Sequence, residues 1–183
     1  MPKILTNVKD DICRITRQMM ADEGYENLNI RAVAGKCGIG MGTIYNYYHS
    51  KEEIVAEIVL NDWNVILRCM DQANRNGREP MARLESIFGH LQGFIAGFHG
   101  TWVQMSMASG KSPDQARVRC RRHDFRHQLA ERIGVSIGSE PHVFCSDLIA
   151  RLFLSYAPEP GFQFKQMAPA ISGMLMGCSD SAL

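Results

Sequence analysis

Two short helix signals joined by a glycine-containing turn lie within residues 29–53, and they constrain the fold more than any other stretch of the chain. Asn29 is a favourable N-cap, and apolar residues recur at helical spacing directly after it. Gly38 stands where a left-handed residue would end this first helix and turn the chain. A second helix is then predicted from about Met41 to Tyr48. Two short helices in this arrangement predict a helix-turn-helix unit.

The second helix is predicted to have an inner and an outer face. Ile44 and Tyr48 are four residues apart, so both can point into a core. Ser50 and Glu53 follow as a capping box for a further helix, in which the hydroxyl accepts from the Glu53 amide and the carboxylate reaches back. Because the second helix of such a unit enters the major groove of DNA, we expect the outer face to meet a duplex.

The stretch GIGMGTIYNYYHSKEEI at residues 38–54 resembles the signature of the TetR family, the tetracycline-repressor-like bacterial regulators. The pattern is long and ordered, and the likeness in motifs ends at about Ile54. Beyond that residue only the length and the helical layout are similar. The residues that match the family pattern are Gly38, Gly42, Thr43, Ile44, Tyr45, Tyr47, Ser50, Lys51 and Glu52.

The resemblance implies an all-α protein of about nine helices. Residues 1–50 would form a three-helix helix-turn-helix DNA-binding domain, and residues 51–183 a helical domain for effector binding and dimerisation. The implied function is a repressor that binds a palindromic operator as a homodimer and is released by a small-molecule effector. The residues expected at the DNA are Arg31, Met41, Gly42, Thr43, Tyr45, Asn46, Tyr47, His49 and Lys51.

Three positions depart from the family pattern. Met41 replaces a residue that is often polar, and methionine offers only apolar contact, for instance to a thymine methyl group. His49 replaces a frequent lysine, so one phosphate contact is expected to be weaker or pH-dependent. Gly40 replaces the usual serine N-cap, at a cost of about a few tenths of a kcal/mol. The operator sequence therefore does not follow from the motif.

Composition limits the remaining classes of protein. The net charge of the 183 residues is only +1, so contact with nucleic acid must come from the local placement of charge. The six cysteines are dispersed without a Cys-x-x-Cys pair, which favours buried free thiols in a reducing compartment. No apolar run has the length of a membrane span and the N-terminus lacks a signal-peptide core, so we expect a cytoplasmic protein without a membrane partner.

The rest of the chain reads as helices. Residues 4–23 and 51–74 carry apolar stripes, and the second of these is long enough to leave the DNA-binding unit. Further helices are expected at 80–98, 101–108, 113–132 and 142–156, followed by a last one beginning near Gln166 or kinked at Pro169. The last two are so apolar that a two-fold dimer, with Ile171 in its interface, is expected to cover them.

Large and adaptable side chains in the second domain predict a mostly apolar effector pocket, although each of them could instead be ordinary core. We expect a small hydrophobic effector. A constitutive dimeric regulator without an effector is the alternative. Gly89, Gly93, Gly97 and Gly100, in or beside the helix at 80–98, leave room for either a close helix or a ligand. The residues expected to line the pocket are Trp63, Met70, Phe94, Phe98, Trp102, Met105 and Phe125.

A cluster of Cys120, His123 and His127 at helical spacing raises the further alternative of a metal-responsive regulator, since thiolate and imidazole suit zinc. The neighbouring arginines would repel a cation, so no metal site and no cofactor are expected. No nucleophile elbow, phosphate-binding loop or metal-hydrolase motif occurs in the sequence. The chain is therefore not expected to be an enzyme.

Overall fold

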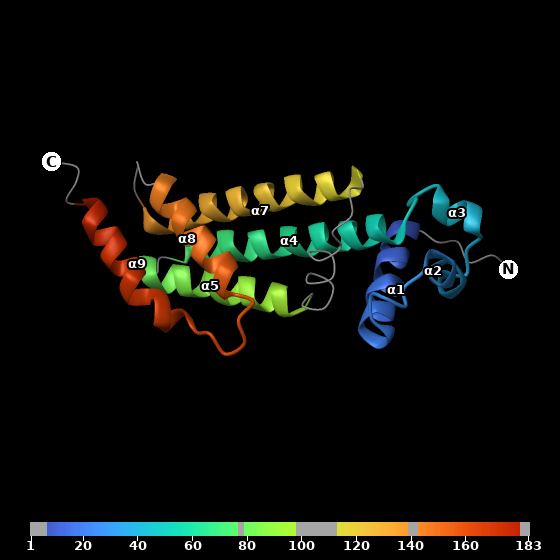
Figure 1. The fold of residues 1–183 in the computed structure, drawn as a ribbon, viewed down its shortest axis with the longest axis horizontal. Coiled ribbons are helices and arrows are strands. Elements are labelled where there is room, and N and C mark those ends of the chain that lie inside the picture. Colours follow the sequence, from blue (N-terminus) through green and yellow to red (C-terminus); the bar gives the residue numbers. More distant parts are fainter. Residues whose placement is uncertain (1–6, 77–78, 98–112, 139–142, 180–183) are drawn as a thin grey trace. The chain divides into compact units, whose positions relative to one another are not determined.

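The computed structural model of the protein describes residues 7–76, 79–97, 113–138 and 143–179, with side chains described throughout except at 113–123, 143 and 177–179. Within these ranges the chain is all-helical (Figure 1). It divides into two compact units, Met1–Trp63 and Asn64–Leu183. The helices are α1 Val8–Glu23, α2 Ile30–Cys37, α3 Met41–Tyr45, α4 Lys51–Arg75, α5 Pro80–Gly97, α7 Pro113–Ile137, α8 Val143–Tyr156 and α9 Phe164–Ser179.

Helix α2 begins and ends as the sequence predicts. The Asn29 side chain accepts a hydrogen bond from the amide of Ala32 at 2.8 Å, which satisfies a free donor of the first turn. At the other end Gly38 is left-handed, with φ 69° and ψ 27°. The Ile39 amide donates to Ala34 and the Gly38 amide to Gly35, both at 3.1 Å, which is the Schellman arrangement. These bonds fix the turn that leads into α3.

The first unit closes around an apolar core that includes the start of α4. Ile12 of α1, Val33 of α2 and Ile44 of α3 are fully buried, as are Ile54 and Ile58 of α4. The first turns of α4 thus complete the core of a domain that three short helices would leave small.

Ion pairs on the surface also join α1 to α4. Arg17 pairs with Asp62 through both guanidinium nitrogens, and Lys9 lies 3.4 Å from the carboxylate of Glu57. The compact unit therefore reaches Trp63, whereas the sequence predicts a domain boundary after residue 50. The part of α4 before Asn64 packs with the helix-turn-helix residues.

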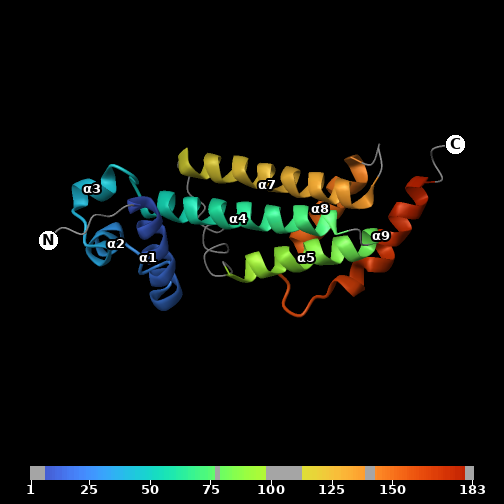
Figure 2. The same ribbon diagram turned by 180° about the vertical axis from the view of Figure 1, so that it is seen from behind.

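In the second unit, α5 and α7 run alongside the second half of α4, and the two views from opposite sides agree on this arrangement (Figures 1 and 2). An aromatic cluster holds α5, α8 and α9 together. The Phe88 ring of α5 meets Phe153 of α8 edge-on with centroids 5.1 Å apart, and Phe164 of α9 lies 6.2 Å from Phe88. Phe88 and Phe153 are buried, so these rings contribute large apolar areas to the core.

A polar bridge joins α4 to α7. The Asn74 amide donates to the carbonyl of Arg132 at 3.0 Å, and the Ser136 hydroxyl donates to the Asn74 side-chain oxygen. The Arg132 guanidinium also lies 3.2 Å from the Asp71 carboxylate. Ser136 is fully buried, so the bridge satisfies polar groups that water does not reach.

Helix α9 begins at Phe164, close to the predicted start near Gln166, and it continues through Pro169 to Ser179. The Gln166 side chain folds back to accept from the Gln163 amide at 2.7 Å, which caps the start. Because Pro169 lies in the second turn, its missing amide removes only one early intrahelical bond. The predicted helix at 101–108 lies outside the described residues.

No helix in the described ranges has both the length and the apolar character needed to cross a membrane.

Candidate nucleic-acid interface

Two buried side chains hold the chain of α3 against the first unit. Ile44 is fully buried and Tyr48 is 2% exposed, as their spacing predicts. The α-helix ends at Tyr45, earlier than the predicted Tyr48, but the turn continues because the amide of Tyr48 donates to the carbonyl of Ile44 at 2.9 Å. The backbone from Met41 to Tyr48 thus presents a fixed outer face.

The start of α4 fixes the other end of this segment. The Glu53 amide donates to the Ser50 hydroxyl at 3.2 Å, which confirms one half of the predicted capping box. The Glu53 carboxylate accepts from the amide of His49 at 2.7 Å, one residue before the amide that a standard box would use. Both bonds tie the chain that leaves α3 to the first turn of α4.

The side chains predicted to contact DNA lie on α2, on α3, in the turn after α3 and at the first residue of α4, and most of them are exposed. Tyr45 is 44% exposed and Tyr47 is 40% exposed, which is unusual for residues so large and apolar. In the described part of the chain neither makes a side-chain hydrogen bond. The exposed members of the predicted set are Arg31, Gly42, Thr43, Tyr45, Asn46, Tyr47 and His49, and the half-buried ones are Met41 and Lys51.

The charge of this surface differs from that of the rest of the unit. Residues 1–63 contain seven Lys or Arg against nine Asp or Glu, so the unit as a whole is slightly acidic. The stretch from Asn27 to Lys51 contains no acidic residue at all. Its charged side chains are cationic, and the acidic residues lie on α1, before Asn27 and on α4. The helix pair that carries the outer face is therefore locally positive.

Lys36 is a further candidate for DNA contact that does not belong to the set predicted from the sequence. It is exposed in the last turn of α2 and pairs with Glu23 at 2.7 Å. The signal for it in the sequence is its place as a basic residue within the acid-free stretch. An exposed pair of this kind is weak, so the ammonium can exchange Glu23 for a phosphate.

Lys51 has internal partners that the sequence did not predict. Its ammonium donates to the carbonyl of Tyr25 at 3.3 Å and lies 4.5 Å from the centre of the Tyr25 ring. The Tyr25 hydroxyl in turn donates to Glu52 at 3.2 Å. Burial raises the pKa of the Tyr25 phenol to about 12, and the charge of Glu52 adds to the shift. Lys51 is thus positioned before any ligand arrives.

Beneath α3, the Cys13 thiol lies 3.5 Å from the hydroxyl of Tyr48. Burial raises the pKa of Cys13 and also that of Tyr48, so both groups stay protonated at neutral pH. A protonated, half-buried thiol is a poor nucleophile. This contact therefore supports the packing of α3 rather than any chemistry.

The predicted effector residues of the described chain are all buried. Trp63, Met70, Phe94 and Phe125 are at most 6% exposed. Trp63 is the last residue of the first unit, and the other three belong to the second. The remaining predicted lining residues, Phe98, Trp102 and Met105, lie outside the described residues, so the assembly of this pocket stays a prediction.

Two smaller expectations also concern the second unit. A Cβ atom placed at Gly89, Gly93 or Gly97 would meet nothing within 4 Å, so no helix approaches α5 closely along these glycines in the described part of the chain. His127 is exposed and lies 3.5 Å from Glu131. The side chains of Cys120 and His123 lie outside the described set, so the metal cluster stays untested.

The comparisons with known proteins agree with this geometry. Residues 12–58 match the family model described as bacterial regulatory proteins, tetR family. The chain is 25% identical over 80 residues to the transcriptional repressor KstR2 of Mycolicibacterium smegmatis, which is 44% of this chain and 39% of that protein. It is 23% identical over 96 residues to the transcriptional regulator UidR of Escherichia coli, covering 52% and 45%. The chain thus spans less than half the length of these curated relatives.

The fold is shared over nearly the whole chain with solved proteins. A putative TetR-family regulator from Syntrophomonas wolfei aligns with a TM-score of 0.58 at 15% identity, covering 96% of each chain. This likeness concerns the fold alone. Taken with the helix-turn-helix geometry, the family model leads to one assignment: residues 12–58 form a DNA-binding region of the type found in bacterial regulatory proteins of the tetR family.

Proposed function

We propose that this protein is a cytoplasmic, homodimeric transcriptional regulator that acts as a ligand-responsive repressor. The observation that carries the proposal is the outer face of α2 and α3. It combines exposed Tyr45 and Tyr47, exposed Arg31 and a 25-residue stretch without a carboxylate, and the buried Ile44 and Tyr48 hold it in place. A polyanion is the partner that such a face suits.

Different side chains take different roles in this proposal. The guanidinium of Arg31 contacts a guanine edge or a phosphate, and Tyr45 and Tyr47 pack and hydrogen-bond along the backbone. Thr43 and Lys51 contact phosphates and set the register. Met41 supplies an apolar contact in the groove. Each protomer reads one half-site, and the half-sites are about one helical turn or somewhat more apart.

Dimerisation through α8 and α9 would present two copies of this face. Phe144 at the start of α8 is 78% exposed and Met176 near the end of α9 is 69% exposed. Exposed apolar side chains that lie together on a surface are typical of an interface with a partner. A two-fold axis through these helices would bury both side chains in an isologous interface.

The effector would bind in the apolar interior of the second unit, near Met70, Phe94 and Phe125. It releases DNA only if it binds more tightly to the conformation that does not fit the operator. The names of the relatives do not indicate which effector this chain binds, because the matched stretches cover only 44% and 52% of this chain. We propose a regulatory rather than a catalytic role for the whole protein.

The test is binding to DNA from the region upstream of the chain's own gene. Fluorescence anisotropy should give specific binding that Arg31→Ala weakens by about 1–3 kcal/mol if Arg31 contacts a base. An equal loss on operator and random DNA would assign Arg31 to a phosphate. Loss of binding with one of a panel of hydrophobic small molecules supports the sensor, and DNA binding that no such molecule alters would favour the constitutive alternative.

A further inference from the structure

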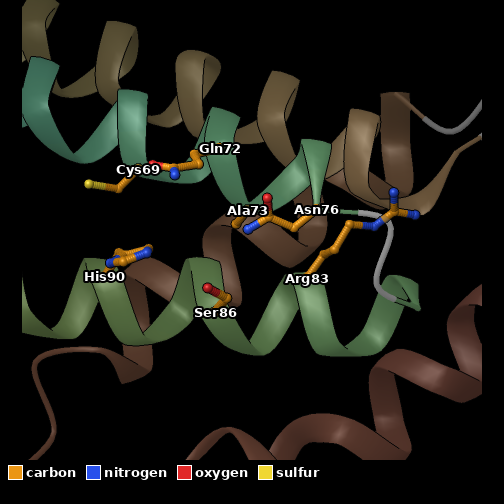
Figure 3. A pocket seen from close by; sticks show the side chains of 7 residues that line it. All are labelled: Cys69, Gln72, Ala73, Asn76, Arg83, Ser86 and His90. Carbon is orange, nitrogen blue, oxygen red and sulfur yellow. The ribbon is translucent and has the colours of Figure 1, made fainter.

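A polar groove lies between α4 and α5, apart from the buried apolar residues proposed for the effector. It has a volume of about 190 Å³. Figure 3 shows Asn76 and Arg83 together at one end, Ser86 between, and Cys69 and His90 at the other. Its seven lining residues are Cys69, Gln72, Ala73, Asn76, Arg83, Ser86 and His90, all in the second unit.

The lining is rich in hydrogen-bond donors and contains no carboxylate. Arg83 is the only permanently charged member, and amides, a hydroxyl, an imidazole and a thiol accompany it. The acidic residues of α4 and at the start of α5 do not pair with Arg83 in the described ranges. Asp71 pairs with Arg132, and Glu79 and Glu85 are exposed without an ion pair to Arg83 in the described ranges. The groove is therefore positive.

One nitrogen of the half-buried Arg83 guanidinium lacks a hydrogen-bond partner in the described part of the chain. Its Nε atom is buried and has no hydrogen-bond acceptor in the described part of the chain. An unmatched buried donor of this kind is costly, and a charged one more so. A planar oxyanion is the group that a guanidinium binds best, through two parallel hydrogen bonds.

The size of the groove limits the ligand. Its volume of about 190 Å³ equals about six water volumes at roughly 30 Å³ each, and it is smaller than the pockets that hold drug-sized ligands. The space suits a short acid. Ala73 and Cys69 give the wall an apolar portion beside the donors.

We propose that this groove is a binding site for a small oxyanion, whose charged group sits between Arg83 and Asn76 and accepts from Ser86. The rest of the ligand extends toward Cys69 and His90. Because the lining comes from both helices, the bound anion joins α4 to α5 and stabilises the second unit. This goes beyond the proposed repressor function and needs no DNA for its test.

The experiment uses the full chain and three probes. Succinate represents a small carboxylic acid, inorganic phosphate represents the other common oxyanion, and succinamide is the uncharged analogue of succinate. Isothermal titration calorimetry gives the affinities, and thermal unfolding reports the stabilisation that binding must produce. We expect succinate or phosphate to bind and raise the melting temperature, and succinamide to bind at least tenfold more weakly. The comparison of the two anions decides between carboxylate and phosphate.

Three variants locate the binding. Arg83→Gln should weaken the anion at least tenfold, and Ser86→Ala should weaken it several-fold with less disturbance of the fold. Arg68→Gln removes an exposed arginine of α4 that does not line the groove, so it should bind like the wild type. If Arg83→Gln lowers the melting temperature in the absence of anion, the test relies on Ser86→Ala and on the alkylation of Cys69. Peptide mass spectrometry should show that bound succinate protects Cys69 from iodoacetamide.

Several results would overturn the proposal. The proposal is wrong if neither succinate nor phosphate binds at tens of millimolar. It is also wrong if Arg68→Gln and Arg83→Gln lower the affinity for the anion equally. Succinamide binding as tightly as succinate would remove the role of charge. Succinate binding that leaves the alkylation of Cys69 unchanged would place the anion elsewhere. None of these outcomes depends on whether the chain binds an operator.

Discussion

The carboxylate of Glu53 accepts a hydrogen bond from the backbone amide of His49 at 2.7 Å. The bond crosses from the first turn of α4 to the last residues of the segment that carries α3. It satisfies an amide that neither helix would otherwise use, and it sets the angle at which the chain leaves α3. The orientation of the proposed DNA-reading surface thus depends on an acidic residue that does not belong to that surface.

Replacing Glu53 by alanine should destabilise the protein by about 1 kcal/mol, the usual cost of losing a helix cap. Urea unfolding would measure this loss. Glu26→Ala is the matched control, since Glu26 is exposed and makes no hydrogen bond through its side chain in the described chain. Equal stability of the two variants would show that the cap contributes nothing beyond surface charge.

Ile44 and Tyr47 are three residues apart, and substitutions at the two positions should distinguish effects on stability from effects on DNA binding. Tyr47→Ala removes an exposed side chain, so it should leave the unfolding free energy within about 0.5 kcal/mol of wild type while reducing DNA affinity. Ile44→Ala empties a fully buried site and should cost about 2–5 kcal/mol. Urea unfolding and anisotropy on the same upstream DNA measure both quantities. Full DNA affinity in Tyr47→Ala would remove this tyrosine from the interface.

Alkaline pH should destabilise the protein through Tyr25. Its pKa is raised to about 12 from the ordinary value of 10.0, so the folded state holds the phenolic proton where the unfolded chain loses it. Stability is therefore fully present below pH 10 and falls as the pH rises toward 12. Tyr25→Phe should show a shallower fall in urea unfolding over this range. At pH 7 it should lose about 1 kcal/mol for the hydrogen bond to Glu52. If the stability of Tyr25→Phe falls with pH as steeply as that of the wild type, the raised pKa of Tyr25 is contradicted.

The proposed subunit interface is best tested at Phe144. Ile171, which the sequence places at the interface, is fully buried within its own chain, so Ile171→Glu would damage the fold instead. Phe144→Glu changes a side chain that is 78% exposed and should convert dimers to monomers. Light scattering after gel filtration gives the mass. Val135→Glu, at a 63% exposed site on α7, is the control that should remain dimeric.

The local features of the first unit could be predicted because single residues specify them. Asn29 caps α2, Gly38 adopts the left-handed turn, and Ile44 with Tyr48 faces inward, each for a reason visible in a few neighbouring letters. The contacts of Lys51 with Tyr25 could not be predicted, because 26 residues separate the two and only tertiary packing brings them together.

The second unit was less predictable for the same reason. Its helices follow from apolar periodicity, and Pro80 begins α5 as expected. Periodicity does not say which apolar residue faces a neighbouring helix of the same chain and which faces outward, so Ile171 and Phe144 could not be told apart. The groove at Arg83 combines residues from two helices whose polar positions look like ordinary surface in the sequence.

The turn at Gly38 and the two anchors of α3 have a consequence for how such a regulator changes its target over time. Because Ile44 and Tyr48 hold the segment from beneath, the exposed side chains of Thr43 and Tyr47 contribute little to the packing of the fold. Mutations at these outward positions can accumulate one at a time without loss of a folded intermediate. The chain can thus acquire a new operator by exchanging a few side chains on an unaltered backbone.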